Sequence, residues 1–551
     1  MVRLITTLIS LLAVSTLSFA QQASTAKTTD AGSGYSANDN PATTPVMQHR
    51  RCGTSLNLER IKGEPTRAVS ASANYVPHNG TVTIPVILAN YSDVKFTVDH
   101  PKAAFEQFFN GTTQKELGNG NSSNHGSVAQ YFSDMSSGTF TPTFKILGPV
   151  TLNHTMRYYG GNQANSNADE RTSEMVNDAI NALQASDEKL TDVSPFCSDG
   201  QSIDCVYVIY AGRGQNAGGP DSSVWACTIS FSPYQWLGKP VRWASMGSEL
   251  FHINHHDYIS GIGVTVHELS HAMGLPDFYP LNSSSYLDDQ EMEYWDLMDG
   301  GEYAGNGYCP APDTAFEKNE MGWPVDIQEL TENQKVTMET PTSDGGTAYK
   351  VVNPNNANEY IMLELIRQTG WNSEAYGNGL MAYHVNRPSA NISINDQYNR
   401  VPGFPGMAII PADSLGKSSY LAEDAKSYFN SLAGDLFPGT GNMDNLNVTM
   451  LSDSHPRPNY CWYNTNFSWY NKSANSKLAT NRALGDIAYD TATNVLTFNF
   501  YTHDVTNAVS SVSIHDNNTH AIYTLDGRYA GTTLQALPHG IYITEGRKII
   551  K

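Results

Sequence analysis

One stretch decides the fold of this 551-residue chain: His267-Glu268-Leu269-Ser270-His271-Ala272-Met273-Gly274-Leu275-Pro276-Asp277. Histidines at positions i and i+4 lie on one face of a helix, so the imidazoles of His267 and His271 can reach a single metal ion. Glu268 lies one residue along, where its carboxylate can reach a water molecule on that metal. The spacing therefore predicts a helix that carries a zinc site.

The residues after the second histidine supply a third ligand. Gly274 can adopt the left-handed conformation that ends a helix, and the chain then reverses and leads to Asp277. Three protein ligands leave a fourth position for water, whose pKa zinc lowers towards about 7. Glu268 is the predicted general base that takes a proton from this water as it attacks a peptide carbonyl. Together these residues predict a zinc metallopeptidase with His267, His271 and Asp277 as ligands.

An isolated pattern of two histidines and a glutamate also occurs on ordinary amphipathic helices, so the flanking residues matter. The small and apolar lead Gly261–Val266, the glycine stop and the downstream Met298 all favour the zinc site. Met298 has a second interpretation, because a methionine beside Trp295 and Leu297 can equally fill core space. The two interpretations of Met298 are compatible.

The helix motif, followed by Trp295-Asp296-Leu297-Met298-Asp299-Gly300-Gly301, resembles the immune inhibitor A family of secreted metallopeptidases, within the broader metzincin group. The resemblance implies that His267, His271 and Asp277 bind zinc, that Glu268 is the general base, and that Met298 lies in a turn beneath the metal. Relatives often carry serine soon after that methionine, whereas Asp299-Gly300-Gly301 follows here, so the local substrate contacts stay open. Further similar segments are Ser127–Val150, Glu359–Ile361 and Gly379–Val385, which extend the resemblance to roughly residues 80–500.

Residues 1–20 have the pattern of a cleaved secretory signal. A basic residue at Arg3 precedes an apolar run from Leu4 to Val14, and small residues stand at Ser18 and Ala20. The run is short for a membrane span, and no other stretch approaches the ~20 apolar residues of a spanning helix. An exported protein with no transmembrane span is therefore expected.

Residues 21–75 are predicted to be a propeptide and flexible lead, because small and polar residues dominate their first part without an apolar period. The segment Gln48–Thr54 resembles the cysteine-switch segments of some metzincin zymogens, in which a propeptide thiolate occupies the open metal position. A thiolate binds zinc strongly, and the neighbouring Arg50 and Arg51 favour its ionised form. We therefore predict that Cys52 is a zinc ligand in a zymogen. A disulfide or an unbonded thiol is the alternative.

Residues 506–551 are predicted to form a small all-β module of short strands joined by Gly and Pro turns. The strand-like segments are Ala521–Arg528, Leu537–Ile543 and Arg547–Lys551. They resemble the C-terminal sorting domains of the type IX secretion pathway. That resemblance implies a Gram-negative bacterium, recognition by the secretion machinery, and a protein that is secreted or attached to the cell surface. The alternative is a β-module that packs on the enzyme or binds a ligand.

The charge balance limits the classes of partner that the chain can bind. The chain has 54 acidic and 33 basic residues, a formal net charge of −21, which argues against a nucleic acid partner. Calcium is the second cation considered, because Asp288, Asp289 and Asp296 offer oxygen ligands for a surface site. No EF-hand pattern is present, and a solvated acidic surface is the favoured interpretation.

Two further clusters have open interpretations. His252, His255 and His256 lie close together, but their irregular spacing favours solvent-facing histidines over a second metal site. Cys197 and Cys205 would close a small loop as a disulfide in an exported chain, although spacing leaves the pairing open.

The predicted architecture is an α/β metzincin-like catalytic domain over residues 76–335, a β-rich domain over 336–505 and the small all-β C-terminal module. Apolar runs and period-two patterns predict the strands, and a 3.6-residue period with early acidic residues predicts one long helix. The predicted elements are strands at Thr83–Leu88, Val206–Tyr210, Ile361–Leu365 and Val495–Phe500, and a helix at Ala168–Ala185.

The chain is thus predicted to be a secreted zinc-dependent endopeptidase, made as a zymogen, that hydrolyses protein or peptide substrates. The competing interpretation is a surface binding protein that keeps a non-catalytic zinc site. The intact Glu268 argues against that interpretation, because a structural zinc site has no use for a base. Hydrolysis of a bond other than a peptide is also compatible with the motif.

Overall fold

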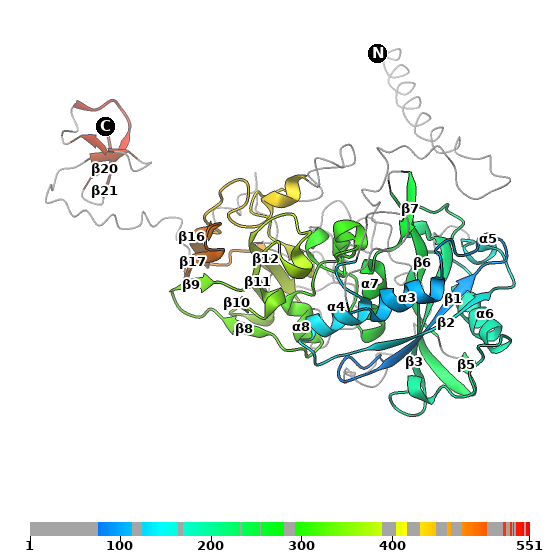
Figure 1. Ribbon diagram of the computed structural model, residues 1–551. Coiled ribbons are helices and arrows are strands. Elements are labelled where there is room, and N and C mark those ends of the chain that lie inside the picture. The colour runs from blue at the N-terminus through cyan, green and yellow to red at the C-terminus, as the bar shows by residue number, and fades with distance from the viewer. Residues whose placement is uncertain are drawn as a thin grey trace, which may run out of the picture.

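A seven-stranded mixed sheet organises the first half of the chain (Figure 1). The computed structural model describes residues 75–112, 124–162, 169–231, 234–253, 255–279, 292–387, 404–415, 430–447, 460–463 and 477–503, together with parts of 522–551. Within these ranges, no helix has both the length and the apolar character needed to cross a membrane. The predicted signal peptide, most of the predicted propeptide, and Cys52 lie outside the described residues.

The central strands of this sheet are apolar along their length, because both faces are covered. β1 (Thr83–Asn90) and β3 (Ile203–Arg213) pair in parallel, with Val86 opposite Tyr207, which confirms two predicted strands. β2, β1, β3 and β6 run parallel in that order, and β4, β5 and β7 each pair with β6 in the antiparallel sense. The bounds of the other strands are Thr143–Thr151 for β2, Cys227–Ser230 for β4, Gln235–Trp236 for β5, Lys239–Ile253 for β6 and His256–Ile259 for β7.

Helices cover the two faces of the sheet, as the alternation of side chains along β1 requires. Val86 and Leu88 face one apolar core, and Ile87 and Ala89 face the other. The first face is covered by α3 (Pro101–Asn110), α4 (Val128–Met135) and α7 (Gly263–Met273), and the second by α5 (Met156–Tyr159) and α6 (Thr172–Gln184) (Figure 1). The predicted helix at Ala168–Ala185 is confirmed as α6, which begins at Thr172 and has Glu174 in its first turn.

β-rich sheets follow the mixed sheet, as predicted. A five-stranded sheet has the order β13-β12-β11-β10-β8, and a three-stranded antiparallel sheet has the order β16-β17-β9. The two sheets share an apolar core that includes Leu363 of β11 and Phe498 of β17. The strands are β8 (Asp326–Glu329), β9 (Gln334–Met338), β10 (Thr347–Asn353), β11 (Asn356–Ile366), β12 (Gly379–Asn386), β13 (Met407–Ile409), β16 (Ala483–Asp490) and β17 (Val495–Tyr501).

The five-stranded sheet also packs against the mixed-sheet unit. Met362 and Tyr383 project from its other face into the core that contains α7 and α8 (Ala315–Glu320). Trp295, in the 3₁₀ turn Glu293–Trp295, donates a hydrogen bond from its indole nitrogen to Asp435 at 2.8 Å, which ties the two units together near the predicted zinc site.

Short strands make up two smaller sheets in the described residues. β14 (Trp462–Tyr463) pairs with β15 (Lys477–Leu478). At the C-terminus, four antiparallel strands have the order β19-β18-β20-β21, which agrees with the strands expected there. Their bounds are Ile522–Thr524 for β18, Tyr529–Gly531 for β19, Ile541–Thr544 for β20 and Arg547–Ile550 for β21.

Candidate metal centre

Both predicted histidine ligands lie on α7, which is buried over most of its length. All residues of Thr265–Met273 are buried, as expected for a helix in a protein interior. The helix begins at Gly263, where a side chain would collide with the carbonyl group of Glu302. The ring centroids of His267 and His271 lie 4.6 Å apart, so the i, i+4 spacing places both imidazoles together.

Gly274 ends α7 in the way that the sequence predicts. Its φ of 113° and ψ of 0° are left-handed, and its amide donates to the carbonyl of His271 at 2.9 Å. The amide of Leu275 donates to the carbonyl of Ser270 at 3.1 Å. The chain then reverses and brings Asp277 back to the two histidines.

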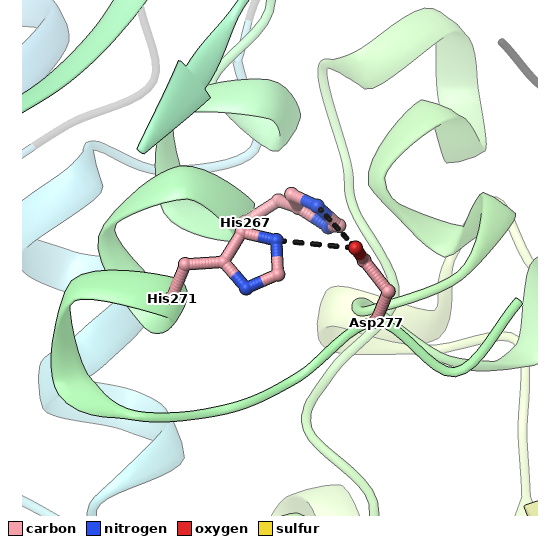
Figure 2. A group of neighbouring side chains, drawn as sticks. All are labelled: His267, His271 and Asp277. Carbon is pink, nitrogen blue, oxygen red and sulfur yellow. Dashed lines mark ion pairs between the residues drawn. The ribbon is translucent and has the colours of Figure 1, made fainter. Parts of the chain in front are cut away.

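The three predicted ligands converge on one point (Figure 2). Oδ1 of Asp277 lies 3.1 Å from Nε2 of His271 and 3.5 Å from Nε2 of His267. All three residues are buried, and these three atoms have no hydrogen-bond partner. Buried polar atoms without partners carry a large free-energy cost unless an ion satisfies them. Two imidazole nitrogens and a carboxylate oxygen are a donor set that suits zinc.

Backbone carbonyls fix the orientation of both imidazole rings. Nδ1 of His267 lies 3.0 Å from the carbonyl oxygen of Leu297, and Nδ1 of His271 lies 2.7 Å from that of Leu275. A carbonyl oxygen can only accept, so each Nδ1 must carry the hydrogen, and in the neutral ring Nε2 is the nitrogen left to bind a metal. Outer contacts of this kind hold a metal-binding tautomer in place.

The turn around Met298 supports two of the ligands. The carbonyl of Leu297 holds His267, and the carbonyl of Met298 accepts a hydrogen bond at 3.0 Å from the amide of Phe278, the residue after Asp277. Met298 is itself fully buried in the core that contains α7. The side chain of Met298 therefore fills core space while its backbone positions the chain beside the site.

Glu268 is buried beside β4, the antiparallel strand at one edge of the sheet. The hydroxyl oxygen of Thr228 lies 2.9 Å from Oε2 of Glu268, 2.6 Å from its backbone oxygen and 2.8 Å from the hydroxyl oxygen of Ser245. Sequence reasoning missed Thr228, because it lies in an ordinary strand 40 residues before Glu268.

The ionisable groups of the centre shift one another's pKa. Burial raises the pKa of Asp277, but His271 and His267 outweigh burial and bring it to about 2. Burial lowers the pKa of His267, but Glu302 and the neighbouring carboxylates raise it to about 10. Oε2 of Glu302 lies 3.8 Å from Nδ1 of His267, and sequence reasoning missed this residue too. A proton and a metal ion therefore compete for the same imidazole.

The other clusters that the sequence suggested differ from the metal centre. His255 and His256 are exposed, as expected, but the expectation was wrong for His252, which is buried and lies 2.8 Å from Oδ1 of Asp257. Cys197 and Cys205 are separate thiols and do not form the disulfide that was considered.

Asp296 is fully buried, so the favoured interpretation of this residue as part of a solvated surface was wrong, as was the alternative of a surface calcium ligand. Its Oδ1 accepts a hydrogen bond from the amide of Met298 at 2.8 Å, so the carboxylate shapes the turn instead. Asp288 and Asp289 lie outside the described residues.

Asp296 belongs to a buried acidic cluster with Asp313 and Glu317. Oδ2 of Asp296, both carboxylate oxygens of Asp313 and Oε1 of Glu317 are buried without hydrogen-bond partners. Burial raises the pKa of Asp296 to about 8; the Met298 amide opposes this rise and Asp313 adds to it. Burial also raises the pKa values of Asp313 and Glu317. Protons therefore remain in this cluster at neutral pH.

We expect Asp296→Asn to flatten the dependence of stability on pH. A carboxyl group with a raised pKa stabilises the fold fully below its unfolded pKa of about 4, and this contribution is lost as pH rises towards about 8. Asparagine keeps the acceptor for the Met298 amide and cannot ionise. Relative to the wild type, the variant should gain at least about 1.4 kcal/mol of unfolding free energy across this window.

Urea unfolding across that pH range, with a chelator present to remove metal linkage, measures the effect of Asp296→Asn. The exposed Asp187 provides the control, because Asp187→Asn should leave the shape of the profile unchanged. A difference between Asp296→Asn and the wild type that does not vary with pH would contradict the account of the acidic cluster.

Gly274→Ala is expected to weaken both folding and zinc binding. A left-handed backbone costs a residue with a side chain about 1–2 kcal/mol, and the added methyl would lie 3.2 Å from the ring of Tyr75. Because Gly274 directs the chain to Asp277, zinc affinity should fall as well. Gly200→Ala is the matched control: Gly200 has a φ of +72° and open space around it, so that variant should lose stability but keep zinc. Unchanged zinc affinity in Gly274→Ala would refute the role of this turn.

The segment that contains the metal centre is similar to known proteins. Residues 86–324 match the family model described as immune inhibitor A peptidase M6, catalytic domain. The chain is 25% identical over 289 residues to immune inhibitor A of Bacillus thuringiensis subsp. alesti, a match that covers 46% of this chain and 42% of that protein. It is 24% identical over 242 residues to the pre-pro-metalloprotease PrtV of Vibrio cholerae serotype O1, a match that covers 39% of this chain and 26% of that protein. The chain thus spans less than half the length of these relatives.

Proposed function

Because residues 86–324 match the catalytic-domain model of the immune inhibitor A peptidase M6 family, we propose that this protein is a zinc-dependent endopeptidase. The observation that carries the proposal is the convergence of three buried atoms without hydrogen-bond partners: Nε2 of His267, Nε2 of His271 and Oδ1 of Asp277. When bound there, zinc supplies a Lewis acid for a peptide carbonyl and lowers the pKa of water. The proposed substrates are proteins or peptides.

The side chains of this centre divide the remaining work. The carboxylate of Glu268 is the proposed general base, which accepts a proton from the attacking water and passes it to the leaving amine. The hydroxyl of Thr228 lies within hydrogen-bond distance of this carboxylate and orients it. The carbonyls of Leu297 and Leu275 keep both imidazoles in one tautomer, so the ligands need no rearrangement before reaction.

A surface binding protein with a non-catalytic zinc site is the competing function. The position of Glu268 next to a metal ligand speaks against it, because a structural site has no use for a proton acceptor. The two functions differ in one measurable property, which is turnover.

Cleavage of unfolded casein by the processed protein tests the proposal. We expect cleavage that stops after removal of zinc by a chelator and returns when zinc, but not calcium, is added back. Full activity in the zinc-free protein would refute the proposed chemistry. Stoichiometric zinc without cleavage of casein would favour the binding protein.

The proposal includes export as a zymogen. The match to a protein named as a pre-pro-metalloprotease supports a precursor with a signal peptide at residues 1–20 and a propeptide within 21–75. Cys52 is the proposed latency ligand, supported by its place beside Arg50 and Arg51. Cys52→Ala should yield a precursor that cleaves casein before processing, and an equally latent variant precursor would remove Cys52 from the proposal.

The C-terminal module, residues 506–551, is the proposed sorting signal for type IX secretion from a Gram-negative cell. Its four short antiparallel strands, β18–β21, are compatible with a compact sorting signal. A chain that ends near Val505 should stay inside the cell, whether the full-length protein is released or attached to the surface. A truncated chain that reaches the medium would contradict this part of the proposal.

The proposed division of the chain takes account of strand pairing. β8 pairs with β10 and β9 pairs with β17, although both strands begin before residue 335. We therefore propose that the β-rich unit begins near residue 325 and extends to about 505. The catalytic unit then comprises residues 76 to about 325, which agrees with the end of the family match at residue 324. Calcium is not part of the proposal.

A further inference from the structure

We propose that His154, Glu174 and Asp178 form a second site for a divalent transition-metal ion, separate from the catalytic centre. Glu174 and Asp178 lie one helical turn apart on α6, and His154 precedes α5. These elements pack on the face of the mixed sheet opposite to α7, because α6 belongs to one apolar core and α7 to the other. The inference is independent of the proposed peptidase function.

The geometry resembles that of the catalytic ligands in one respect. One ligand atom from each of His154, Glu174 and Asp178 lies within 4.8 Å of the other two, as is also true of His267, His271 and Asp277. The set combines an imidazole nitrogen with two carboxylates. That combination suits Zn²⁺, Co²⁺ or Mn²⁺, whereas Ca²⁺ and Mg²⁺ prefer oxygen ligands alone.

Two tyrosines hold the carboxylates in place. The hydroxyl of Tyr158 donates to Oε1 of Glu174 at 3.0 Å, and the hydroxyl of Tyr159 donates to Oδ2 of Asp178 at 2.6 Å. The ring of His154 stacks on that of Tyr158 with centroids 3.9 Å apart. Supporting contacts of this kind orient metal ligands before the ion binds.

The backbone under the three ligands is also anchored. Met156 and Tyr159 of α5 and Met175 and Ala179 of α6 are buried in the same core. The carbonyl of His154 accepts a hydrogen bond from the amide of Ser92 at 3.0 Å. The three ligands therefore approach one another on segments that packing already holds, and an ion would cross-link the loop after β2 to α6.

Arg171, which directly precedes α6, already has partners of its own. Arg171 lies over the ring of Tyr158, 4.7 Å from its centroid, and is paired with Glu170 at 3.0 Å. Its Nη1 nitrogen also donates to the carbonyl oxygen of Tyr158 at 3.1 Å, so Arg171 is engaged with Tyr158 and Glu170. A metal ion at this solvent-accessible position would stabilise the fold. Because the position lies on the face of the sheet opposite to α7, the ion would take no part in catalysis.

Calorimetric titration of the metal-free full-length protein with zinc tests the proposal. We expect two zinc ions per chain in the wild type and one in His154→Ala and in Asp178→Asn, with casein cleavage after processing unchanged. The asparagine variant keeps the size of Asp178, so the test does not depend on one substitution. Zinc should also raise the melting temperature of the wild type more than that of either variant.

His256→Ala is the matched control, because it removes another exposed histidine of the same catalytic unit and should leave two zinc ions bound. One zinc ion per wild-type chain that is still bound in both His154→Ala and Asp178→Asn would overturn the proposal. Two zinc ions in both the His154→Ala and Asp178→Asn proteins would also overturn it, because the second ion would then lie elsewhere.

Discussion

Glu268→Gln is expected to lower kcat/KM for casein-derived peptides by about 10²–10⁴-fold while leaving one zinc ion in the catalytic centre. Glutamine has nearly the same size and keeps an oxygen that can accept from the hydroxyl of Thr228, so the packing of α7 should not change. Its amide cannot accept the proton of the attacking water. The loss should therefore appear in kcat, and the binding of substrate should change little.

Thr228→Val provides a graded comparison for Glu268→Gln. It leaves the carboxylate of Glu268 able to ionise and removes the hydroxyl next to it, so activity should fall by a smaller factor. Peptide kinetics and zinc analysis of both variants separate the loss of a base from the loss of the metal. Activity close to that of the wild type in Glu268→Gln would show that another group takes the proton.

Asp277→Ala is expected to have the largest effect on metal binding. The substitution removes the only carboxylate among the three proposed ligands and leaves the two Nε2 atoms of His267 and His271 facing an apolar methyl group. Changes to groups that only support metal ligands already cost 10–100-fold in affinity, so loss of a ligand should cost more than about 100-fold. Competition with a chromophoric zinc chelator measures this constant directly.

Asp257→Ala is the matched control for Asp277→Ala, because Asp257 is another carboxylate in contact with a histidine, 2.8 Å from Nδ1 of His252, but is not one of the three converging residues. That variant should bind zinc in the catalytic centre as tightly as the wild type. Wild-type zinc affinity in Asp277→Ala would mean that a different residue completes the ligand set. Casein cleavage by both variants should follow their zinc content.

The convergence of His267, His271 and Asp277 could be predicted from the sequence because the three residues lie within an 11-residue stretch. Helix geometry alone places His267 and His271, at i and i+4, on one face. Gly274 ends the helix because glycine readily adopts a left-handed backbone, which is a local property. The structure brings Asp277 to the histidines as this local reasoning requires. Buried strands such as β1 and β3 were predictable for a similar reason, because an uninterrupted run of apolar residues indicates a strand that is buried on both faces.

Contacts between distant segments could not be predicted in this way. Thr228 meets Glu268 only because β4 joins the edge of the sheet, and Glu302 meets His267 only because the chain after Met298 folds back onto the start of α7. The burial of Asp296 also eluded sequence reasoning, because an acidic residue is usually exposed and its neighbours Asp313 and Glu317 arrive from a later segment. Such groups become visible only when tertiary packing is known.

Diffraction from crystals of the processed protein on both sides of the zinc absorption edge tests the central claim most directly. The account predicts an anomalous peak that vanishes below the edge and lies about 2.0–2.2 Å from Nε2 of His267, Nε2 of His271 and the carboxylate of Asp277. The carboxylate of Glu268 should face the open side of this ion. A catalytic-centre ion held by other residues, or one closed by a fourth protein ligand, would contradict the account.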